Sequence, residues 1–186
     1  MMERTIACLV LIAGLQACTA APPLDVQYYD VEGTTRQALR RSLAERGPIG
    51  DDGVRYHAYT RWFVRWNYRL ASSAGGCRVD SLEVGLEATM ILPRWSGSKD
   101  APASLRRQWE RYVAALRLHE EGHYAHGVAV VDEVRRRLAA LGGTENCGRL
   151  RQRVDAEGEA VLEAYRKRER EYDLHTGHGA TQGARI

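Results

Sequence analysis

The sequence lacks a large net charge, a phosphate-binding glycine loop, an internal repeat and a linker to a second domain. Its 24 acidic and 27 basic residues nearly cancel, so the overall charge gives no reason to expect a nucleic-acid partner. With 44% hydrophobic and 27% charged residues, the composition is that of a globular chain and excludes disorder, collagen-like repeats and a coiled coil. The 186 residues are enough for one domain with a hydrophobic core.

The N-terminus also lacks a hydrophobic run long enough to cross a membrane. The apolar run from Ile6 to Leu15 has 10 residues, which fits the core of a signal peptide and is too short for a bilayer. Arg4 precedes the run, and Leu15-Gln16-Ala17-Cys18 ends it. This ending resembles the lipobox of bacterial lipoproteins, in which the cysteine is lipidated and becomes the first residue. We therefore predict that a lipid on Cys18 anchors the protein to a membrane.

The predicted signal peptide places the domain outside the cytoplasm. The residue after the cysteine is Thr19 and not Asp. By resemblance, this is typical of lipoproteins of the outer membrane in Gram-negative cells. We expect the protein at the periplasmic face of the outer membrane. A soluble periplasmic or secreted protein, cleaved near Ala20 or Ala21, is the alternative. The predicted parts are a lipoprotein signal peptide (1–17), a tether (18–24) and a single domain (25–186).

Only two cysteines, Cys77 and Cys147, remain in the predicted domain. Two thiols in an oxidising compartment usually pair, and their separation does not match the short Cys-x-x-Cys spacing of zinc sites built on cysteine. We predict a disulfide that joins the start of a strand to the start of a helix. Two separate buried thiols are the alternative.

Alternating hydrophobic residues predict a β-hairpin over residues 54–70 and 77–92. Apolar or aromatic residues occupy most second positions from Tyr56 to Leu70, and the alternation resumes from Leu82 to Leu92. A period of two predicts strands with one buried face. Pro93 is expected to end the second strand. On the open face, opposite charges are expected to meet across the strands, with Arg61, Arg65 and Arg69 on one and Glu83 and Glu87 on the other.

The other segments predict one more strand and three helices, and therefore an α+β fold. Residues 26–31 are typical of a short strand, which we expect to join the hairpin in a small antiparallel sheet. Two long helices are expected to pack on this sheet. The predicted helices cover residues 35–45, ended by Gly47-Pro48; a long segment capped by Asp100 with Pro102 in its first turn and ended by Gly142-Gly143; and a second long segment from Thr144 to about Tyr172.

The first long helix carries the sequence His119-Glu120-Glu121-Gly122-His123, an H-E-x-x-H motif. Residues four apart lie one above the other on a helix, so both imidazoles can reach one metal ion. Zinc lowers the pKa of its bound water toward about 7, and a carboxylate beside it can take the proton as the water attacks a carbonyl. About 0.015 matches of this pattern are expected by chance in a chain of this composition.

The motif therefore predicts a zinc site with His119 and His123 as ligands and Glu120 as the general base. The alternative is a pair of buried histidines with Glu120 at their rim. The helix stripe that holds the motif is otherwise apolar or aromatic, and it consists of Tyr112, Leu116, His119, His123, His126, Val130 and Val134.

A third ligand is needed, and the residues leave three candidates. His126 lies on the same stripe, but it is about 10 Å above His119 on a continuous helix, so it would reach the metal only if the helix bent at Gly127. Asp173 and His178 follow the second long helix, which an antiparallel arrangement would bring back toward the motif. We favour His178, then Asp173, then His126.

These motifs resemble a known family over most of the predicted domain. The matching features are Tyr29 to Thr34, Thr60-Arg61-Trp62, Cys77, Ile91-Leu92-Pro93, the H-E-x-x-H motif, and Tyr172-Asp173 followed by Thr176, His178 and Gly179. The chain is similar to the bacterial predicted secreted zinc-dependent proteases, a family first described as a domain of unknown function. The resemblance implies zinc at His119 and His123, a base at Glu120, and a role for His178.

The motif and the resemblance together predict a zincin-like peptidase of the cell envelope that acts on a peptide or protein substrate. An exposed edge of the sheet could hold an extended peptide by strand addition. One alternative is a non-catalytic lipoprotein, a binding or scaffold module that keeps zinc for stability. Another is a zinc amidase that acts on cell-wall peptides.

Overall fold

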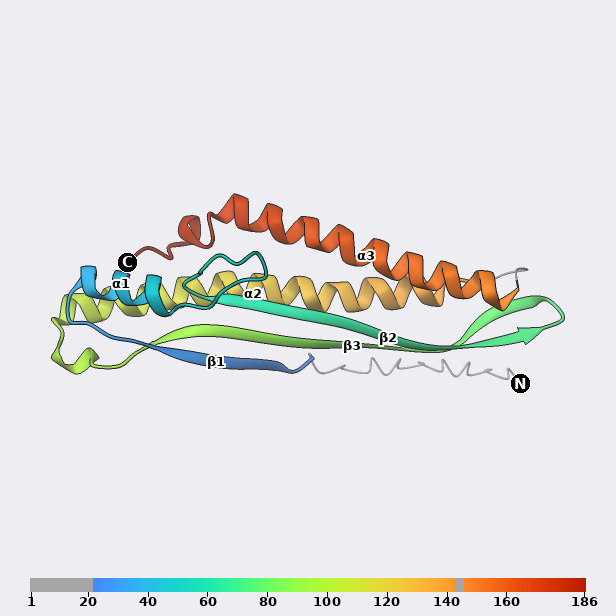
Figure 1. Ribbon diagram of the computed structural model, residues 1–186, viewed down its shortest axis with the longest axis horizontal. Coiled ribbons are helices and arrows are strands. Elements are labelled where there is room, and N and C mark those ends of the chain that lie inside the picture. Colours follow the sequence, from blue (N-terminus) through green and yellow to red (C-terminus); the bar gives the residue numbers. More distant parts are fainter. Residues whose placement is uncertain (1–21, 143–145) are drawn as a thin grey trace, which may run out of the picture.

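The computed structural model describes residues 22–142 and 146–186 (Figure 1). The predicted signal peptide, the lipidation site Cys18 and the expected helix cap Thr144 lie outside these ranges. The described strands are β1 (Leu24–Val31), β2 (Tyr59–Ser73) and β3 (Gly76–Trp95). The helices are α1 (Arg36–Arg46), α2 (Ala103–Ala139) and α3 (Cys147–Thr176), with the short 3-10 helices η1 (Ser98–Asp100) and η2 (Ala180–Gln182).

The predicted α+β class is confirmed, but the sheet is mixed rather than antiparallel. The strand order is β1-β3-β2; β2 and β3 form the predicted antiparallel hairpin, whereas β1 lies parallel to β3. Alternation along a sequence indicates which side chains face the core, but it does not give the direction of the neighbouring strand. The expectation of an antiparallel N-terminal strand was therefore wrong.

The hairpin differs from its predicted bounds at both ends. Residues 54–58, predicted as the first part of the strand, belong instead to a loop over residues 47–58. In this loop the Asp52 carboxylate accepts a hydrogen bond from the Val54 N–H. Pro93 does not end β3. The pairing of β2 with β3 stops at Tyr59 and Ile91, so Pro93 lies where one side of β3 is open, and proline is tolerated at such an edge.

The open face of the hairpin carries one of the expected cross-strand ion pairs. Arg65 and Glu87 lie 2.9 Å apart. Arg61 instead lies 3.7 Å from Asp51 of the loop, and Arg69 donates a hydrogen bond to Ser81. The register places Asn67 opposite Glu83, which is why the two charged columns do not pair throughout.

The helices α2 and α3 do not begin at the residues that the sequence predicts. Asp100 belongs to η1 and does not cap α2, because Ala101 before Pro102 is held extended (φ −93°, ψ 154°), so the helix cannot include the residues before the proline. Asn146 caps α3, where its side chain accepts a hydrogen bond from the Arg149 N–H. The helix α3 also continues to Thr176, beyond the expected end at Tyr172.

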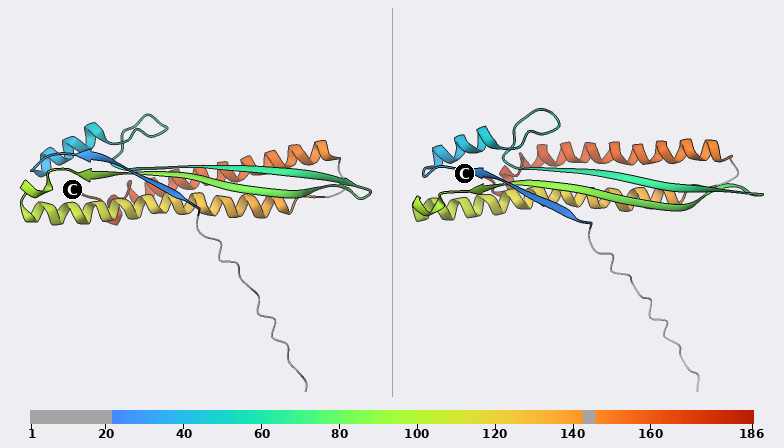
Figure 2. Two further views of the ribbon diagram at one scale, coloured as in Figure 1. Left: turned by 90° about the horizontal axis from the view of Figure 1, so that it is seen from below. Right: turned by 60° about the horizontal axis from the view of Figure 1, so that its bottom comes forward.

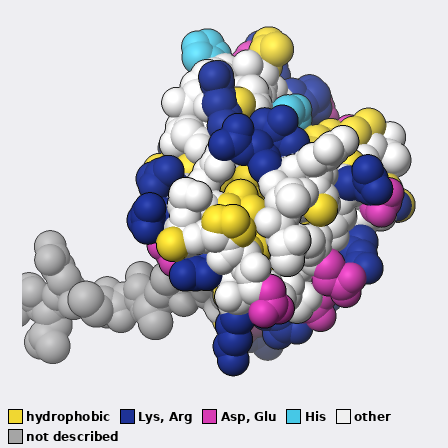
Figure 3. All heavy atoms as spheres, turned by 90° about the vertical axis from the view of Figure 1, so that its left-hand side faces the viewer, with side chains coloured by type: hydrophobic (Ala, Val, Ile, Leu, Met, Phe, Trp, Pro, Cys, Tyr) yellow, Lys and Arg dark blue, Asp and Glu magenta, His cyan; other side chains and the backbone are white. Residues whose placement is uncertain are grey.

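The sheet and α2 run side by side along the length of the molecule, and α3 lies against α2 (Figures 1 and 2). The predicted disulfide between Cys77 and Cys147 is present and joins the start of β3 to the first turn of α3. The end of the molecule that bears α1 exposes more Lys and Arg than Asp and Glu side chains (Figure 3). Within residues 22–142 and 146–186, no helix is long and apolar enough to span a bilayer.

Two hydrophobic clusters make up the core, one toward each end of α2. The first lies at the α1 end, where Tyr112 and Leu116 of α2 pack with residues of β1, α1 and β3. The second lies at the disulfide end, where Val130 and Val134 of α2 pack with residues of α3 and the hairpin. The H-E-x-x-H motif lies on α2 between the two clusters.

Candidate metal centre

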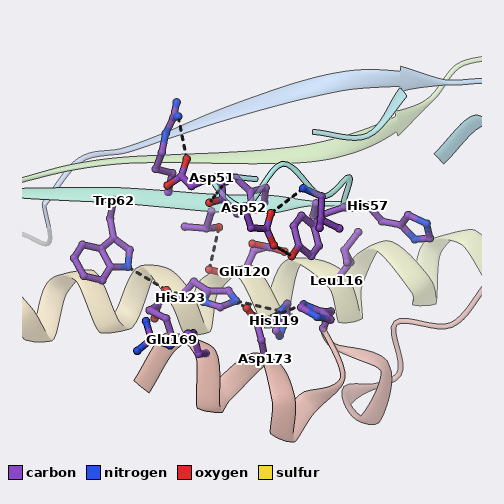
Figure 4. Close-up of a pocket in the computed structure, with 18 of the residues that line it drawn as sticks. Asp51, Asp52, His57, Trp62, Leu116, His119, Glu120, His123, Glu169 and Asp173 are labelled. Atoms are coloured by element: carbon purple, nitrogen blue, oxygen red, sulfur yellow. Dashed lines mark hydrogen bonds and ion pairs between the residues drawn. The ribbon is translucent and has the colours of Figure 1, made fainter. Parts of the chain in front are cut away.

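The motif occupies the buried face of α2, as its position on the apolar stripe predicts. His119 is 2% exposed, Glu120 3% and His123 7%. The carboxyl-terminal third of α3 lies alongside these residues and brings Glu169 and Asp173 against the two histidines (Figure 4). Two histidines of α2 therefore meet two carboxylates of α3 where these helices pack.

Three possible ligand atoms converge in this group. Nε2 of His119 and Nε2 of His123 are 3.2 Å apart. Oδ1 of Asp173 lies 3.2 Å from the first nitrogen and 3.0 Å from the second. Atoms that carry lone pairs repel one another at such distances unless a positive charge lies among them, so the geometry calls for a proton or a metal ion at the centre of the triangle. We refer to these three residues as the metal group.

The ring of His123 is oriented by Glu169. His123 Nδ1 lies 2.8 Å from Glu169 Oε2, and a carboxylate accepts, so Nδ1 is the donor and Nε2 is left to face the metal group. Trp62 Nε1 donates to the same carboxylate oxygen at 3.3 Å, and His126 Nδ1 donates to the other oxygen. Glu169 thus accepts three hydrogen bonds and acts as an anchor for His123.

The ring of His119 is oriented by neutral groups. His119 Nδ1 lies 3.0 Å from Gln182 Oε1 and 3.3 Å from Thr176 Oγ1. The ring of Tyr172 stacks on the ring of His119, with 5.0 Å between centroids and 8° between planes, and the Tyr172 hydroxyl donates to the backbone oxygen of His119. These contacts fix both the position and the rotation of the imidazole.

The electrostatics of the group favour positive charge at its centre. Burial on its own would raise the pKa of Asp173, but its close contacts with His119 and His123 outweigh burial and hold that pKa well below its usual range. Burial on its own would lower the pKa of His123, but hydrogen bonds to Asp173 and Glu169 raise it to about 10. A metal ion would compete with this proton for the same acceptors.

Glu120 lies beside β2 on the buried face of α2. Its backbone oxygen accepts a hydrogen bond from Thr60 Oγ1 at 3.3 Å, and burial raises the pKa of its carboxyl. Among the residues that the structure describes, Glu120 Oε2 is the one buried side-chain oxygen with no hydrogen-bond partner. A native protein rarely leaves such an atom unpaired unless a water, ion or ligand belongs beside it.

The metal group and Glu120 open into a pocket of about 1110 Å³. Residues 59–64 of β2 form one wall, and Leu162, Arg166 and Asp173 of α3 lie on the other. The loop 47–58 and the residues after α3 close one end. Figure 4 shows Asp51 and Asp52 of this loop on the side of the pocket opposite Asp173.

The structure brings together only some of the predicted third ligands. Asp173 joins His119 and His123, whereas His178, which we favoured, does not. Its side chain is 53% exposed and lies 3.3 Å from Asp173, with its ring 5.2 Å from that of Tyr56. Because α3 stays helical to Thr176, Asp173 remains on the face that points to α2, and His178 comes only after the left-handed Gly177.

His126, which we ranked third among the candidate ligands, lies outside the metal group. Its Nδ1 contacts Glu169, and α2 continues without a break through Gly127. His123, His126 and Glu169 do form a second cluster whose atoms are close enough for a metal. Both histidines donate to Glu169, so this cluster is already satisfied as a hydrogen-bonded unit.

Sequence reasoning missed Glu169 and Gln182. Glu169 and Asp173 are four residues apart, the same spacing as His119 and His123, so two acidic residues on one helix face could have indicated a partner for the two histidines. Gln182 offers no comparable signal, because its contact depends on how the chain turns after α3.

Comparison with known proteins gives a family but no activity. A search of curated proteins and of solved structures found no match to this chain. One family matches residues 26–179, a range that includes most of the sheet, the H-E-x-x-H motif, Glu169 and Asp173. Its description, a bacterial protein of unknown function, assigns no protease activity. Because the match covers most of the sequence, the chain belongs to this bacterial family of unknown function, DUF922.

Proposed function

We propose that this chain is a zinc-dependent peptidase with His119, His123 and Asp173 as the zinc ligands and Glu120 as the general base. The observation that carries the proposal is the convergence of two imidazole nitrogens and one carboxylate oxygen at 3.0 to 3.2 Å. Tetrahedral zinc with ligands at about 2.0 to 2.1 Å holds its ligand atoms about 3.3 Å apart. The donor set and its spacing therefore suit zinc.

The residues around the group support a catalytic rather than a purely structural metal. Structural zinc sites use four protein ligands, whereas catalytic sites use three and leave one position open. When bound, zinc would polarise a carbonyl and acidify water. Glu120 would accept the proton, because its unpaired oxygen lies in the same pocket and burial raises its pKa, which makes its carboxylate a stronger base.

The same pocket suits an extended peptide as the substrate. The strand β2 is an edge strand in the order β1-β3-β2, so its outer backbone groups have no strand partner within the described ranges. Residues 59–64 line the pocket beside the metal group. A peptide could add to β2 by backbone hydrogen bonds and run between β2 and α3, which would bring one of its carbonyls past Glu120.

The proposal is tested by comparing Glu120→Gln with Glu121→Gln. Both changes remove one carboxylate from adjacent positions of α2, but Glu121 is half-exposed and lies 3.8 Å from Arg117. We expect both proteins to bind zinc. Hydrolysis of an unstructured protein substrate should fall by about 10² to 10⁴ in Glu120→Gln, the range typical of positioned acid-base groups, and remain unchanged in Glu121→Gln.

Other outcomes of this comparison point to the alternatives. If Glu120→Gln keeps zinc and full activity, or if the wild-type protein binds zinc without hydrolysing any peptide, the scaffold hypothesis replaces the peptidase. If the protein cleaves only cell-wall material, at the amide bond that joins sugar to peptide, it is an amidase.

We also propose that the domain works outside the cytoplasm, held to a membrane by a lipid on Cys18. The disulfide between Cys77 and Cys147 supports this location, because such bonds persist in oxidising compartments. Mass spectrometry of the protein from a bacterial membrane fraction tests it. An N-terminal lipid on Cys18 is the expected result, and an unprocessed N-terminus would contradict the proposal.

A further inference from the structure

The chain turns back over the metal group after α3, in residues 177–186, here named the C-terminal segment. Gly177 and Gly179 have φ values of 55° and 82°, the left-handed region that glycine adopts without strain. Gly179 also packs against His119, because a Cβ built on it would lie 3.1 Å from the Cβ of that residue. The segment then continues into η2, which contains Gln182.

Both ends of the Gln182 amide are used at the metal group. Oε1 lies 3.0 Å from His119 Nδ1, and Nε2 donates to the Tyr172 hydroxyl at 3.1 Å. That hydroxyl in turn donates to the backbone oxygen of His119. Gln182 therefore closes a ring of hydrogen bonds that touches His119 at its side chain and at its backbone.

Gln182 and Thr176 together determine which nitrogen of His119 carries the proton. The Thr176 hydroxyl donates to the backbone oxygen of Tyr172 at 2.7 Å, so toward His119 Nδ1, 3.3 Å away, its oxygen can only accept. Both neighbours of Nδ1 are then acceptors, which makes Nδ1 the donor and leaves the Nε2 lone pair directed at His123 and Asp173.

The remainder of the segment is docked into the core at the α1 end. Ile186 is buried in the cluster that contains Tyr112 and Leu116, and its backbone oxygen accepts a hydrogen bond from Arg40 Nε at 2.6 Å. The segment is thus held on both sides of Gln182, by the end of α3 and by Ile186. This docking fixes the position of the amide relative to His119.

We propose that the C-terminal segment is a positioning element for the metal group, and that Gln182 acts by holding His119 with its Nε2 lone pair free for a metal. Gln182 is a positioning residue and has no contact with the metal itself. Gln182 lies beyond residue 179, where the family match ends. The proposal rests on the proposed function in its assumption that the metal group binds zinc.

Three variants separate the hydrogen bond from simple packing. Gln182→Leu keeps the bulk of the side chain and removes the acceptor, Gln182→Glu keeps an acceptor and makes it charged, and Gln152→Leu is a matched control at an exposed position of α3. We expect zinc affinity, measured by competition with a chelator, to fall about 10- to 100-fold in Gln182→Leu, as for other partners of metal-bound histidines. It should be kept or increased in Gln182→Glu and be unchanged in Gln152→Leu.

A second readout needs no metal and separates this proposal from the proposed function. Long-range ¹⁵N–¹H spectra of the metal-free wild-type protein should show the proton of His119 on Nδ1. This preference should be weaker in Gln182→Leu, which retains only the more distant acceptor Thr176. A proton on Nε2 in the wild type, or an unchanged preference in Gln182→Leu, would overturn the proposal. Equal loss of affinity in Gln182→Leu and Gln182→Glu would also overturn it, because the effect would then be one of packing. If the wild type binds no zinc, the proposed function fails and the spectra still decide the role of Gln182.

Discussion

The two ends of the molecule are held together in different ways, although α2 runs through both. At one end, Cys77 and Cys147 join the hairpin to α3 covalently, and Val134, Leu138 and Val154 pack around them fully buried. At the other end, α1 and the C-terminal segment dock without a covalent link. The buried polar group lies between these ends, so each end can supply stability without contributing ligands.

The two apolar clusters allow the fold to hold several buried polar side chains between them. A buried carboxylate or imidazole without a partner is costly, yet His119, Glu120 and His123 lie together between two apolar clusters. We infer that the clusters stabilise the fold and that the centre is organised for binding. Changes at the disulfide end should then affect unfolding, whereas changes at the centre should affect the metal.

Removing the disulfide should have the largest effect on stability. The bond closes a loop with a sequence separation of 70 residues, for which the chain-entropy model gives about 4 kcal/mol. We expect Cys77→Ser combined with Cys147→Ser to lower the free energy of unfolding by this amount, measured by urea titration. Zinc stoichiometry at urea concentrations below the unfolding transition should be unchanged. A double variant that is folded but binds no zinc would show that the disulfide end also shapes the metal group.

Replacing the third ligand should have the next largest effect, and it should fall on the metal alone. Asp173→Asn removes the charge but keeps the shape, and we expect zinc affinity to fall by at least about 100-fold, the upper end for changes around metal ligands. His178→Ala is the matched variant, because His178 contacts Asp173 from the exposed side. A larger loss in His178→Ala would show that this histidine is the third ligand, as the sequence first suggested.

Adding a methyl group at a close contact in the disulfide end should lower the free energy of unfolding by less than loss of the disulfide does. Gly158 of α3 lies against Trp66, and a Cβ at this position would come within 2.4 Å of the indole ring. Overpacking of this kind typically costs about 1 to 3 kcal/mol. Gly158→Ala should therefore lower the free energy of unfolding by this amount in a urea titration. Zinc affinity in chelator competition should stay at the wild-type value, and a loss of it would link the two ends.

A glycine-to-alanine substitution at the centre should produce the smallest effect, and this effect should be on zinc affinity. Gly122 of α2 lies against Tyr172, and a Cβ there would come within 2.2 Å of the hydroxyl. Gly122→Ala must displace the ring that stacks on His119, so we expect about a tenfold loss of zinc affinity. Chelator competition measures it. An unchanged affinity would mean that Tyr172 does not position His119.

The sequence predicted features that depend on neighbouring residues and missed those that depend on distant ones. The spacing of His119 and His123 was enough to place both on one buried helix face, and alternation gave the buried face of β2 correctly. The direction of β1 relative to β3 depends on how the chain returns through α1. The preference for His178 over Asp173 depended on where α3 ends. The helix was predicted to end near Tyr172, four residues before its end at Thr176, which placed Asp173 in the tail.

The most direct test of the account is the zinc content of the full chain after loading at a pH where free histidine is neutral. We predict one equivalent of zinc in the wild type and less than about a tenth of an equivalent when His119→Ala and His123→Ala are combined. Less than a tenth of an equivalent in the wild type would contradict the account, because the three converging atoms would then hold only a proton.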